Sequence, residues 1–226
     1  MDALTQFAVR SVKPDTGFVE SSFVLHGTYV RLEPLELTHT QALAAASAQG
    51  DTELYQWSPV PRGEAETVKY IRTAIEWREA GTAVSFAIVR MADQQVIGSS
   101  RFFQMEHWAW PEGHERGGRP FPDACEIGYT WYAPSAIRTA VNTESKLLML
   151  THAFEVWNVF RVCFHTDARN VRSRAALERI GAKFEGVLRA HRMAADFIPR
   201  DSYRYNIVAA EWPEVKMKLQ EKLDRG

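Results

Sequence analysis

The feature that most constrains the fold is the segment from Glu126 to Trp157, in which a strand pattern passes directly into a helix pattern. The run ACEIGYTWY, residues 124–132, is rich in aromatic and β-branched residues, as strands are. The run TESKLLMLTHAFEVW, residues 143–157, places apolar residues three or four apart, as an amphipathic helix does. A helix that directly follows a strand indicates at least one crossover connection in the sheet.

The turn between this strand and this helix, APSAIRTAVN, contains no glycine. The first N–H groups of a helix lack intrahelical acceptors, and together with the helix dipole they favour a bound anion such as phosphate. Asn142 or Thr143 is placed to cap the helix, and Arg138 adds positive charge to the turn. The plainer interpretation is a capped helix with a surface arginine, because every helix has such an end.

A second passage from strand to helix has the same character. The strand FRVCFHTD leads into NVRSRAALERIGA, where Asn170 is placed to cap the helix and Gly181 to end it. Arg169, Arg172 and Arg174 surround this second helix start. Two such turns close together are suited to one extended anionic ligand.

The remaining segments predict further strands and helices. We expect a strand over 23–35 with a turn or bulge at Gly27, helices over 36–50 and 64–81, loops over 51–60 and 106–123, a hairpin over 84–105, and two closing strands over 183–193 and 200–212. This order indicates a single α+β domain over residues 23–226, built on a mostly antiparallel sheet. Residues 1–22 are expected to form an N-terminal arm.

The composition excludes several function classes. The chain has 226 residues, 46% of them hydrophobic, so it can bury a core without disulfides. Its net charge of −1 gives no sign of the strongly basic face that nucleic-acid binding requires. Cys125 and Cys163 lie in strand patterns and are expected to be buried thiols of a reducing compartment. The N-terminus has no long apolar run, so we expect a cytoplasmic protein without a membrane segment.

Glu126 is an acid in the middle of an otherwise apolar strand. A carboxylate in such a place must be hydrogen-bonded, paired with a cation or open to a cleft. Glu126 is therefore either a candidate catalytic residue or one half of an ion pair with a neighbouring arginine such as Arg101. No metal is expected, because the histidines lack metal-binding spacing and no HExxH motif or pair of CxxC motifs occurs.

Six stretches in a fixed order carry a family pattern. They are GTYVRLEPLEL, VIGSSRFF, EIGYTWYAPS, TESKLLMLTHAFE, RVCFHTDARNVRSRAALERIGAKFEGVLR and DSYRYNIVAAEWP. Through them the chain from about Gly27 to Trp212 resembles the GCN5-related N-acetyltransferase (GNAT) superfamily, and most closely its RimJ/RimL-like branch of ribosomal-protein-alanine acetyltransferases. The resemblance implies a central, mostly antiparallel twisted sheet with one splayed parallel strand pair and helices on both faces. It also implies acetyl-CoA as co-substrate.

The resemblance implies where acetyl-CoA lies. In this family it binds where two neighbouring parallel strands splay apart, here the strands of residues 126–132 and 162–166. The pantetheine arm would follow the backbone of Trp131, Tyr132 and Ala133. The pyrophosphate would lie on backbone N–H groups of the glycine-free turn, which are those of Arg138, Thr139, Ala140, Val141, Asn142 and Thr143.

The second helix start also matches family positions. Asn170 and Ser173 match residues beside the pantetheine and the thiol. Arg172 or Arg174 is placed to reach the outer phosphate or the adenine.

The sequence departs from the family pattern in two places. The family turn reads Gln or Arg, two residues, Gly, one residue, then Gly or Ala, where this chain has Ile137, Ala140 and Asn142. Ala140 must approach the phosphate with a Cβ in place, which narrows its backbone freedom. Many relatives carry a Tyr on the short helix that protonates the leaving thiolate, where this chain has Leu177. Ser173 or water is then the candidate acid.

For a transferase of this family, the resemblance implies direct attack of an amine on the thioester. The amine must arrive neutral, and Glu126 is the candidate general base, acting directly or through water. Two other functions stay open. One is a GNAT-fold module that binds CoA without transfer, which the altered turn and Leu177 favour. The other is transfer of a different acyl group, such as succinyl.

The acceptor is expected between the early helices and the loop of residues 106–123. Candidate walls are Tyr55, Trp57, Phe102 and Trp108, because aromatic rings suit an amine with an apolar part. Each ring taken singly is more often part of the packing. The loop itself is either functional or a solvated insertion. The acceptor is a protein N-terminus or a small-molecule amine, and a homodimer is compatible with the aromatic residues and edge strands.

Overall fold

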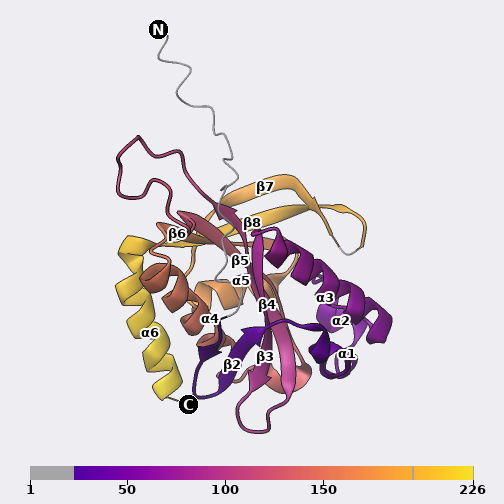
Figure 1. Cartoon of the computed structure of the whole chain (residues 1–226). Helices are drawn as coiled ribbons and strands as arrows, with labels where there is room; N and C mark the ends of the chain where they lie inside the picture. The colour runs from indigo at the N-terminus through magenta and orange to yellow at the C-terminus, as the bar shows by residue number, and fades with distance from the viewer. Residues whose placement is uncertain (1–22, 195, 226) are drawn as a thin grey trace.

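The computed structural model describes residues 23–194 and 196–225. Its centre is an eight-stranded sheet with the strand order β1-β2-β3-β4-β5-β6-β8-β7 (Figure 1). The strands are β1 (Leu25–His26), β2 (Val30–Pro34), β3 (Ala83–Arg90), β4 (Val96–Glu106), β5 (Ala124–Tyr132), β6 (Arg161–Asp167), β7 (Lys183–Met193) and β8 (Pro199–Val208). Every neighbouring pair is antiparallel except β5 and β6, which confirms the predicted sheet. The arm expected over residues 1–22 lies outside the described residues.

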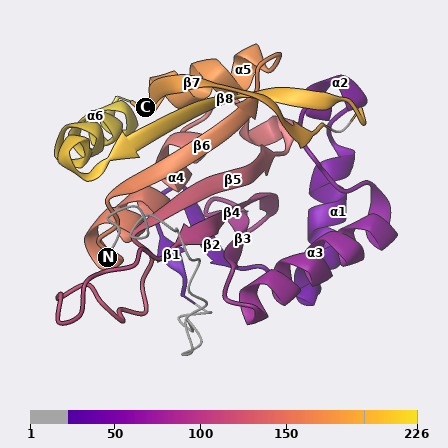
Figure 2. The same ribbon diagram turned by 90° about the horizontal axis from the view of Figure 1, so that it is seen from above.

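Helices cover both faces of this sheet, as predicted (Figure 2). They are α1 (Thr40–Ala48), α2 (Thr52–Tyr55), α3 (Gly63–Glu79), α4 (Val141–Thr151), α5 (Val171–Arg179) and α6 (Trp212–Asp224). On one face α1 and α3 pack over a cluster that includes Leu43 and Ala87. On the other face α4, α5 and α6 pack over a larger cluster that includes Phe86 and Leu150. Within the described parts of the chain, no helix has both the length and the apolar content needed to span a bilayer.

One short helix was not expected. α2 occupies the first part of the loop predicted over residues 51–60. Asp51 caps it by accepting a hydrogen bond from the backbone N–H of Leu54 at 2.7 Å. Four residues are too few to show a helical period in a sequence, so hydrophobic periodicity did not predict this helix.

A second unexpected helix, α6, follows the last strand. The strand β8 ends at Val208, four residues before the predicted end. Pro213 lies in the first turn of α6, where its missing N–H leaves no hydrogen bond unmade. Val215 and Leu219 are buried against the α4 face of the sheet. The prediction carried the strand on to Trp212, the first residue of this helix.

The parallel strands β5 and β6 pair over only three positions, from Ala124 with Arg161 to Glu126 with Cys163. Beyond Glu126 they are not paired, and β5 continues beside β4 while β6 continues beside β8. The sheet therefore opens between the two strands, as the resemblance implied. We call this place the β5–β6 opening.

A β-bulge interrupts β5 just inside this opening. Between Gly128 and Trp131, β5 has one residue more than the β4 segment with which it pairs. Tyr129 in the bulge has a φ of 51°. The bulge reverses the alternation of side chains along β5. Ile127 belongs to the α4-side cluster and Trp131 to the α1–α3 cluster, although a regular strand would place both on one face.

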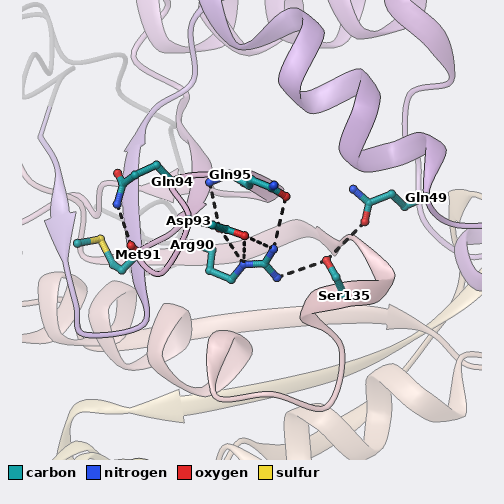
Figure 3. Close-up of polar contacts among 7 residues, drawn as sticks. All are labelled: Gln49, Arg90, Met91, Asp93, Gln94, Gln95 and Ser135. Atoms are coloured by element: carbon teal, nitrogen blue, oxygen red, sulfur yellow. Dashed lines mark hydrogen bonds and ion pairs between the residues drawn. The ribbon is translucent and has the colours of Figure 1, made fainter.

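The β3–β4 hairpin supports the turn that follows β5. Arg90 and Asp93 pair at 2.7 Å and close the turn of this predicted hairpin (Figure 3). Arg90 Nη1 donates to Ser135 Oγ, and Ser135 Oγ donates to Gln49 Oε1 at the end of α1, each at 3.4 Å (Figure 3). Both bonds are long and therefore weak. Together they connect the start of the turn to two other elements.

Candidate functional site

A cleft of about 1020 Å³ lies at the β5–β6 opening. It is lined by the unpaired parts of both strands, the turn before α4, the first turns of α4, and residues along the whole length of α5. Residues of α2, of the β7–β8 hairpin and of the end of α6 complete its lining. The cleft thus gathers segments that are far apart in the sequence.

Most of the predicted site residues line this cleft. They are Tyr55, Trp57, Glu126, Trp131, Tyr132, Arg138, Thr139, Ala140, Asn142, Thr143, Asn170 and Ser173. They come from the two passages from strand to helix and from the segment around α2. The fold therefore brings both turns to one cleft.

Three predicted cofactor-binding residues have side chains elsewhere. Ala133 and Val141 are buried in the clusters on either side of the sheet. Arg174 extends over the ring of Tyr203, with its guanidinium 4.3 Å from the ring centre. Of the two arginines considered for an outer phosphate, Arg172 lines the cleft and Arg174 does not.

Two predicted acceptor-site residues, Phe102 and Trp108, do not line the cleft. Phe102 is fully buried on the α4 side of the sheet, with its ring 4.6 Å from that of Trp157. Trp108 stacks on Phe160 at 5.1 Å, and its backbone N–H donates to Asp123 at 2.8 Å. The loop that carries Trp108 is therefore packed beside the start of β6, away from the β5–β6 opening.

The turn before α4 adopts its conformation without glycine. Arg138 has a φ of 61°, in the left-handed region that favours glycine. Thr139 Oγ1 accepts a hydrogen bond from the N–H of Val141, where the helix begins. Asn142 and Thr143 therefore lie in the first turn of α4 and do not cap it, contrary to the prediction. The first N–H groups of this helix still have no intrahelical acceptors, and so can bind an anion.

The start of α5 has the predicted cap. Asn170 Oδ1 accepts a hydrogen bond from the N–H of Ser173 at 3.0 Å. Leu177 also lines the cleft, at the position for which the resemblance implied a tyrosine in many family members. This side of the cleft therefore offers a serine hydroxyl and no phenol from α5.

The charge of the cleft is strongly positive, although the whole chain has a net charge of −1. Among the residues that the structure describes, its lining holds one carboxylate, that of Glu126. Against it stand seven basic side chains, those of Arg138, Lys146, Arg172, Arg179, Arg192, Arg200 and Lys222. Such a cleft attracts an anionic ligand.

Lys146 is a cleft residue that the sequence analysis did not single out. It is 5% exposed, and its Nζ donates to Thr130 Oγ1 at 2.8 Å. A second, longer contact of 3.5 Å joins Nζ to Ser100 Oγ. Burial lowers the pKa of Lys146 to about 7. Its burial could have been expected from the sequence, because Lys146 lies three residues before Met149 and four before Leu150, on the apolar stripe of α4.

Glu126 lies in a polar network at the other end of β5. It is 2% exposed, and its Oε2 lies 2.9 Å from Arg192 Nη2. Gln104, with its amide placed to suit both neighbours, donates to Glu126 Oε2 at 3.1 Å and accepts from Arg192 at 3.0 Å. His165 Nδ1 is also 2.9 Å from Oε2, but its direction is not that of a hydrogen bond. The arginine supplies a charge-assisted hydrogen bond to this carboxyl group.

The expected alternative partner of Glu126, Arg101, lies elsewhere. It is 1% exposed and is surrounded by the rings of Tyr70, Trp77 and Tyr129, at 4.9, 5.1 and 4.2 Å from their centres. Cation–π contacts therefore compensate its burial. An ion pair to Glu126 was a correct expectation, but it comes from β7 and not from the neighbouring strand β4.

Comparison with known proteins identifies the family. Residues 30–183 match the model of the acetyltransferase (GNAT) domain. None of the curated proteins matches the chain. Among solved structures, a GCN5-related N-acetyltransferase from Brucella melitensis superposes with a TM-score of 0.75 at 26% identity, covering 96% of this chain and 89% of that one.

Two further structures are similar. A candidate acetyltransferase from T. thermophilus has 33% identity and a TM-score of 0.71, covering 88% of this chain and 96% of its own. RimJ from Mycobacterium smegmatis, solved in complex with CoA-disulfide, has the same TM-score of 0.71 at 20% identity. The match covers 89% of this chain and 93% of that one. The match to the domain model spans more than half of the chain. The chain therefore belongs to the acetyltransferase (GNAT) domain family.

Proposed function

We propose that the protein transfers the acetyl group of acetyl-CoA to a primary amine, either a protein N-terminus or the amine of a small molecule. The observation that carries this proposal is the cleft at the β5–β6 opening, with seven basic side chains and one carboxylate. The phosphates of CoA supply the complementary charge. The likeness in fold to RimJ, which was solved with CoA-disulfide, supports the same ligand.

In the proposed complex the pyrophosphate lies on the N–H groups of residues 138–143 and the pantetheine follows residues 131–133. Arg138 and Arg172 line this part of the cleft and are our candidates for phosphate contacts. Arg179 also lines it and is held by a 2.8 Å hydrogen bond to Thr143 Oγ1. These charges favour CoA although the turn lacks its usual glycines.

In the proposed reaction the neutral amine attacks the carbonyl carbon of the thioester. A C–N bond forms, the C–S bond breaks, and the sulfur leaves with the electron pair. Glu126 accepts the proton of the amine through a water, because Arg192 and Gln104 already occupy its oxygens. Ser173, or water beside it, donates a proton to the thiolate and regains one from solvent, to which Glu126 releases the proton that it accepted. One proton thus passes from nitrogen to sulfur overall.

Replacing Glu126 by Gln is expected to lower kcat/KM about 100-fold at pH 7, within the range found for general bases. The loss should shrink as the pH rises towards 9, because an α-amino group with a pKa of about 8 then loses its proton without help. Steady-state rates between pH 6.5 and 9 test this. A loss that is the same at every pH would mean that Glu126 only holds Arg192 in place.

The same assays decide between the proposed function and its alternatives. The engagement of Glu126 by Arg192 favours a CoA-binding module without transfer as the second candidate. Release of free CoA thiol, measured with acetyl-CoA and a panel of peptide and small-molecule amines, is expected for the transferase. Tight binding of acetyl-CoA without thiol release would support the module. Faster release from succinyl-CoA than from acetyl-CoA would support transfer of a longer acyl group.

A further inference from the structure

Two arginines face each other at the Glu126 end of the cleft. Arg192 of β7 and Arg200 of β8 are directly opposite in the register of the hairpin, and both line the cleft. Like charges in opposite positions of two strands destabilise a sheet. Two causes lower the pKa of Arg200: burial is the larger, and the positive charge of Arg192 is the second. In the free protein the two positive charges therefore repel each other, and a bound anion would remove this repulsion.

The carboxylates near this pair are already engaged. Glu126 pairs with Arg192. Asp167 accepts two hydrogen bonds from the Arg169 side chain, at 2.8 and 2.9 Å, and Asp196 pairs with the same arginine at 2.8 Å. Arg200 donates to Ser202 Oγ at 3.2 Å. Within residues 23–194 and 196–225, Arg200 forms no ion pair with a carboxylate.

A third side chain at this end lacks a hydrogen-bond partner. The side chain of His165 is 6% exposed and lines the cleft. Among the described residues, neither of its ring nitrogens makes a hydrogen bond, although Nδ1 lies 2.9 Å from Glu126 Oε2, and Nε2 is left without any polar contact. A buried polar group without a partner is costly and commonly marks a place where a ligand or water completes the hydrogen bonds.

The phosphates of CoA do not account for these groups. The phosphate turn begins beyond Tyr132, at the far end of β5, whereas Glu126 lies near its start. Six residues of strand separate the two places, or about 20 Å at 3.3 Å per residue. Arg192 and Arg200 therefore lie at the end where the acceptor amine must meet Glu126.

We infer that the acceptor carries a carboxylate close to its amine, and that Arg200 and His165 bind this carboxylate. The inference rests on the proposed function and names a class of acceptor for it. Arg192 stays with Glu126 and holds the base, while Arg200 supplies the charge that the acceptor neutralises. A planar guanidinium binds a carboxylate through two parallel hydrogen bonds, which fixes orientation as well as charge.

The test uses two pairs of tetrapeptide amides with a free N-terminal alanine. One pair has Asp or Asn at the second position, and the other has Asp or Asn at the third. With the wild-type protein, kcat/KM is expected to be at least about tenfold higher for the Asp peptide of one pair than for its Asn twin. In Arg200→Gln this preference should fall to within about twofold.

Arg189→Gln is the matched control, because Arg189 is an exposed arginine on the same hairpin and does not line the cleft. It should keep the wild-type preference. Equal rates for Asp and Asn peptides with the wild-type protein would overturn the inference. So would a preference that survives Arg200→Gln.

A second measurement does not depend on turnover. The N-acetylated Asp and Asn peptides, which are reaction products, are titrated into the CoA-bound protein by calorimetry. The Asp product should bind at least about tenfold more tightly to the wild type and equally to Arg200→Gln. Equal binding to the wild type would contradict the inference even where no peptide is acetylated. Transfer to the Asn peptides without any Asp preference would leave the proposed function standing and remove only the inference.

Discussion

Replacing Glu144 by Gln is expected to lower the free energy of unfolding by about 3–5 kcal/mol. The carboxylate is 4% exposed and accepts hydrogen bonds from the N–H groups of Thr28, Tyr29 and Val30, at 2.8, 2.6 and 2.8 Å. An amide has one acceptor oxygen, and its NH₂ would face N–H donors. At least one buried N–H therefore loses its partner. The midpoint of thermal unfolding should fall by roughly 10 °C.

Glu214→Gln is the control for this variant. Glu214 is an exposed carboxylate on α6 that pairs with Lys218 one turn away, and its replacement should leave the free energy of unfolding nearly unchanged. Gly27→Ala should resemble Glu144→Gln, because a Cβ at Gly27 would lie 2.4 Å from the Glu144 carboxyl group. Urea unfolding measures all three. Equal stability of Glu144→Gln and Glu214→Gln would show that the buried contacts contribute little.

The Glu144 contacts also bear on the cleft. Glu144 lies in the first turn of α4, so its carboxylate fastens this turn to the β1–β2 connection. The same turn supplies the N–H groups that we assign to the pyrophosphate. Variants that loosen it should therefore bind acetyl-CoA more weakly as well as unfold more easily.

Replacing Lys146 by Met is expected to stabilise the protein at pH 7 by about 2–4 kcal/mol. Burial lowers the pKa of Lys146 from 10.5 to about 7, and each unit corresponds to about 1.4 kcal/mol. The lost hydrogen bond to Thr130 offsets about 1 kcal/mol of the gain. Met has a similar length and no charge to desolvate, so the midpoint of unfolding should rise by about 5–10 °C.

The stabilisation by Lys146→Met must become smaller as the pH rises. Below pH 7 both the folded and the unfolded protein hold the Lys146 proton, and the full cost of burying the charge is present. Between pH 7 and about 10.5 the unfolded chain holds the proton and the folded protein has released it, so the cost disappears as the pH rises. The advantage of Lys146→Met should therefore be largest at pH 6.5 and much smaller at pH 9.5.

Lys69→Met is the matched control, since Lys69 is an exposed lysine on α3. Its stability relative to the wild type should be the same at both pH values. If the difference in the free energy of unfolding between Lys146→Met and the wild type were also the same at both pH values, Lys146 would be protonated in the folded protein over this whole pH range.

The sequence predicted the parts of the fold that rest on local periodicity. The strand and helix on either side of the glycine-free turn, and the cap formed by Asn170, follow from patterns a few residues long, and all three are confirmed. α6 was missed because the predicted strand was extended over the 3₁₀ turn, Ala209–Glu211, that leads into this helix. The bulge at Tyr129 was missed because the usual sequence signal of such a bulge is a glycine at the position with positive φ, and this position holds a tyrosine.

The candidate site was predicted in part for a related reason. Residues in the two turns could be assigned because each turn is a local motif. Arg192 and Arg200 come from a hairpin more than sixty residues after Glu126, and no short pattern brings them to it. Phe102 was misplaced because one strand residue faces either side of a sheet with equal ease, and only the register decides which side.

The most direct test of the central claim is thermal unfolding with and without saturating acetyl-CoA. A ligand at about 100 times its dissociation constant adds roughly 2.7 kcal/mol to the stability of the folded protein. For a chain of this size the midpoint should then rise by about 5–10 °C. A rise of this order would support acetyl-CoA binding in the cleft despite the glycine-free turn. No rise at millimolar acetyl-CoA would mean that Ile137, Ala140 and Asn142 have abolished the site, and would contradict the account.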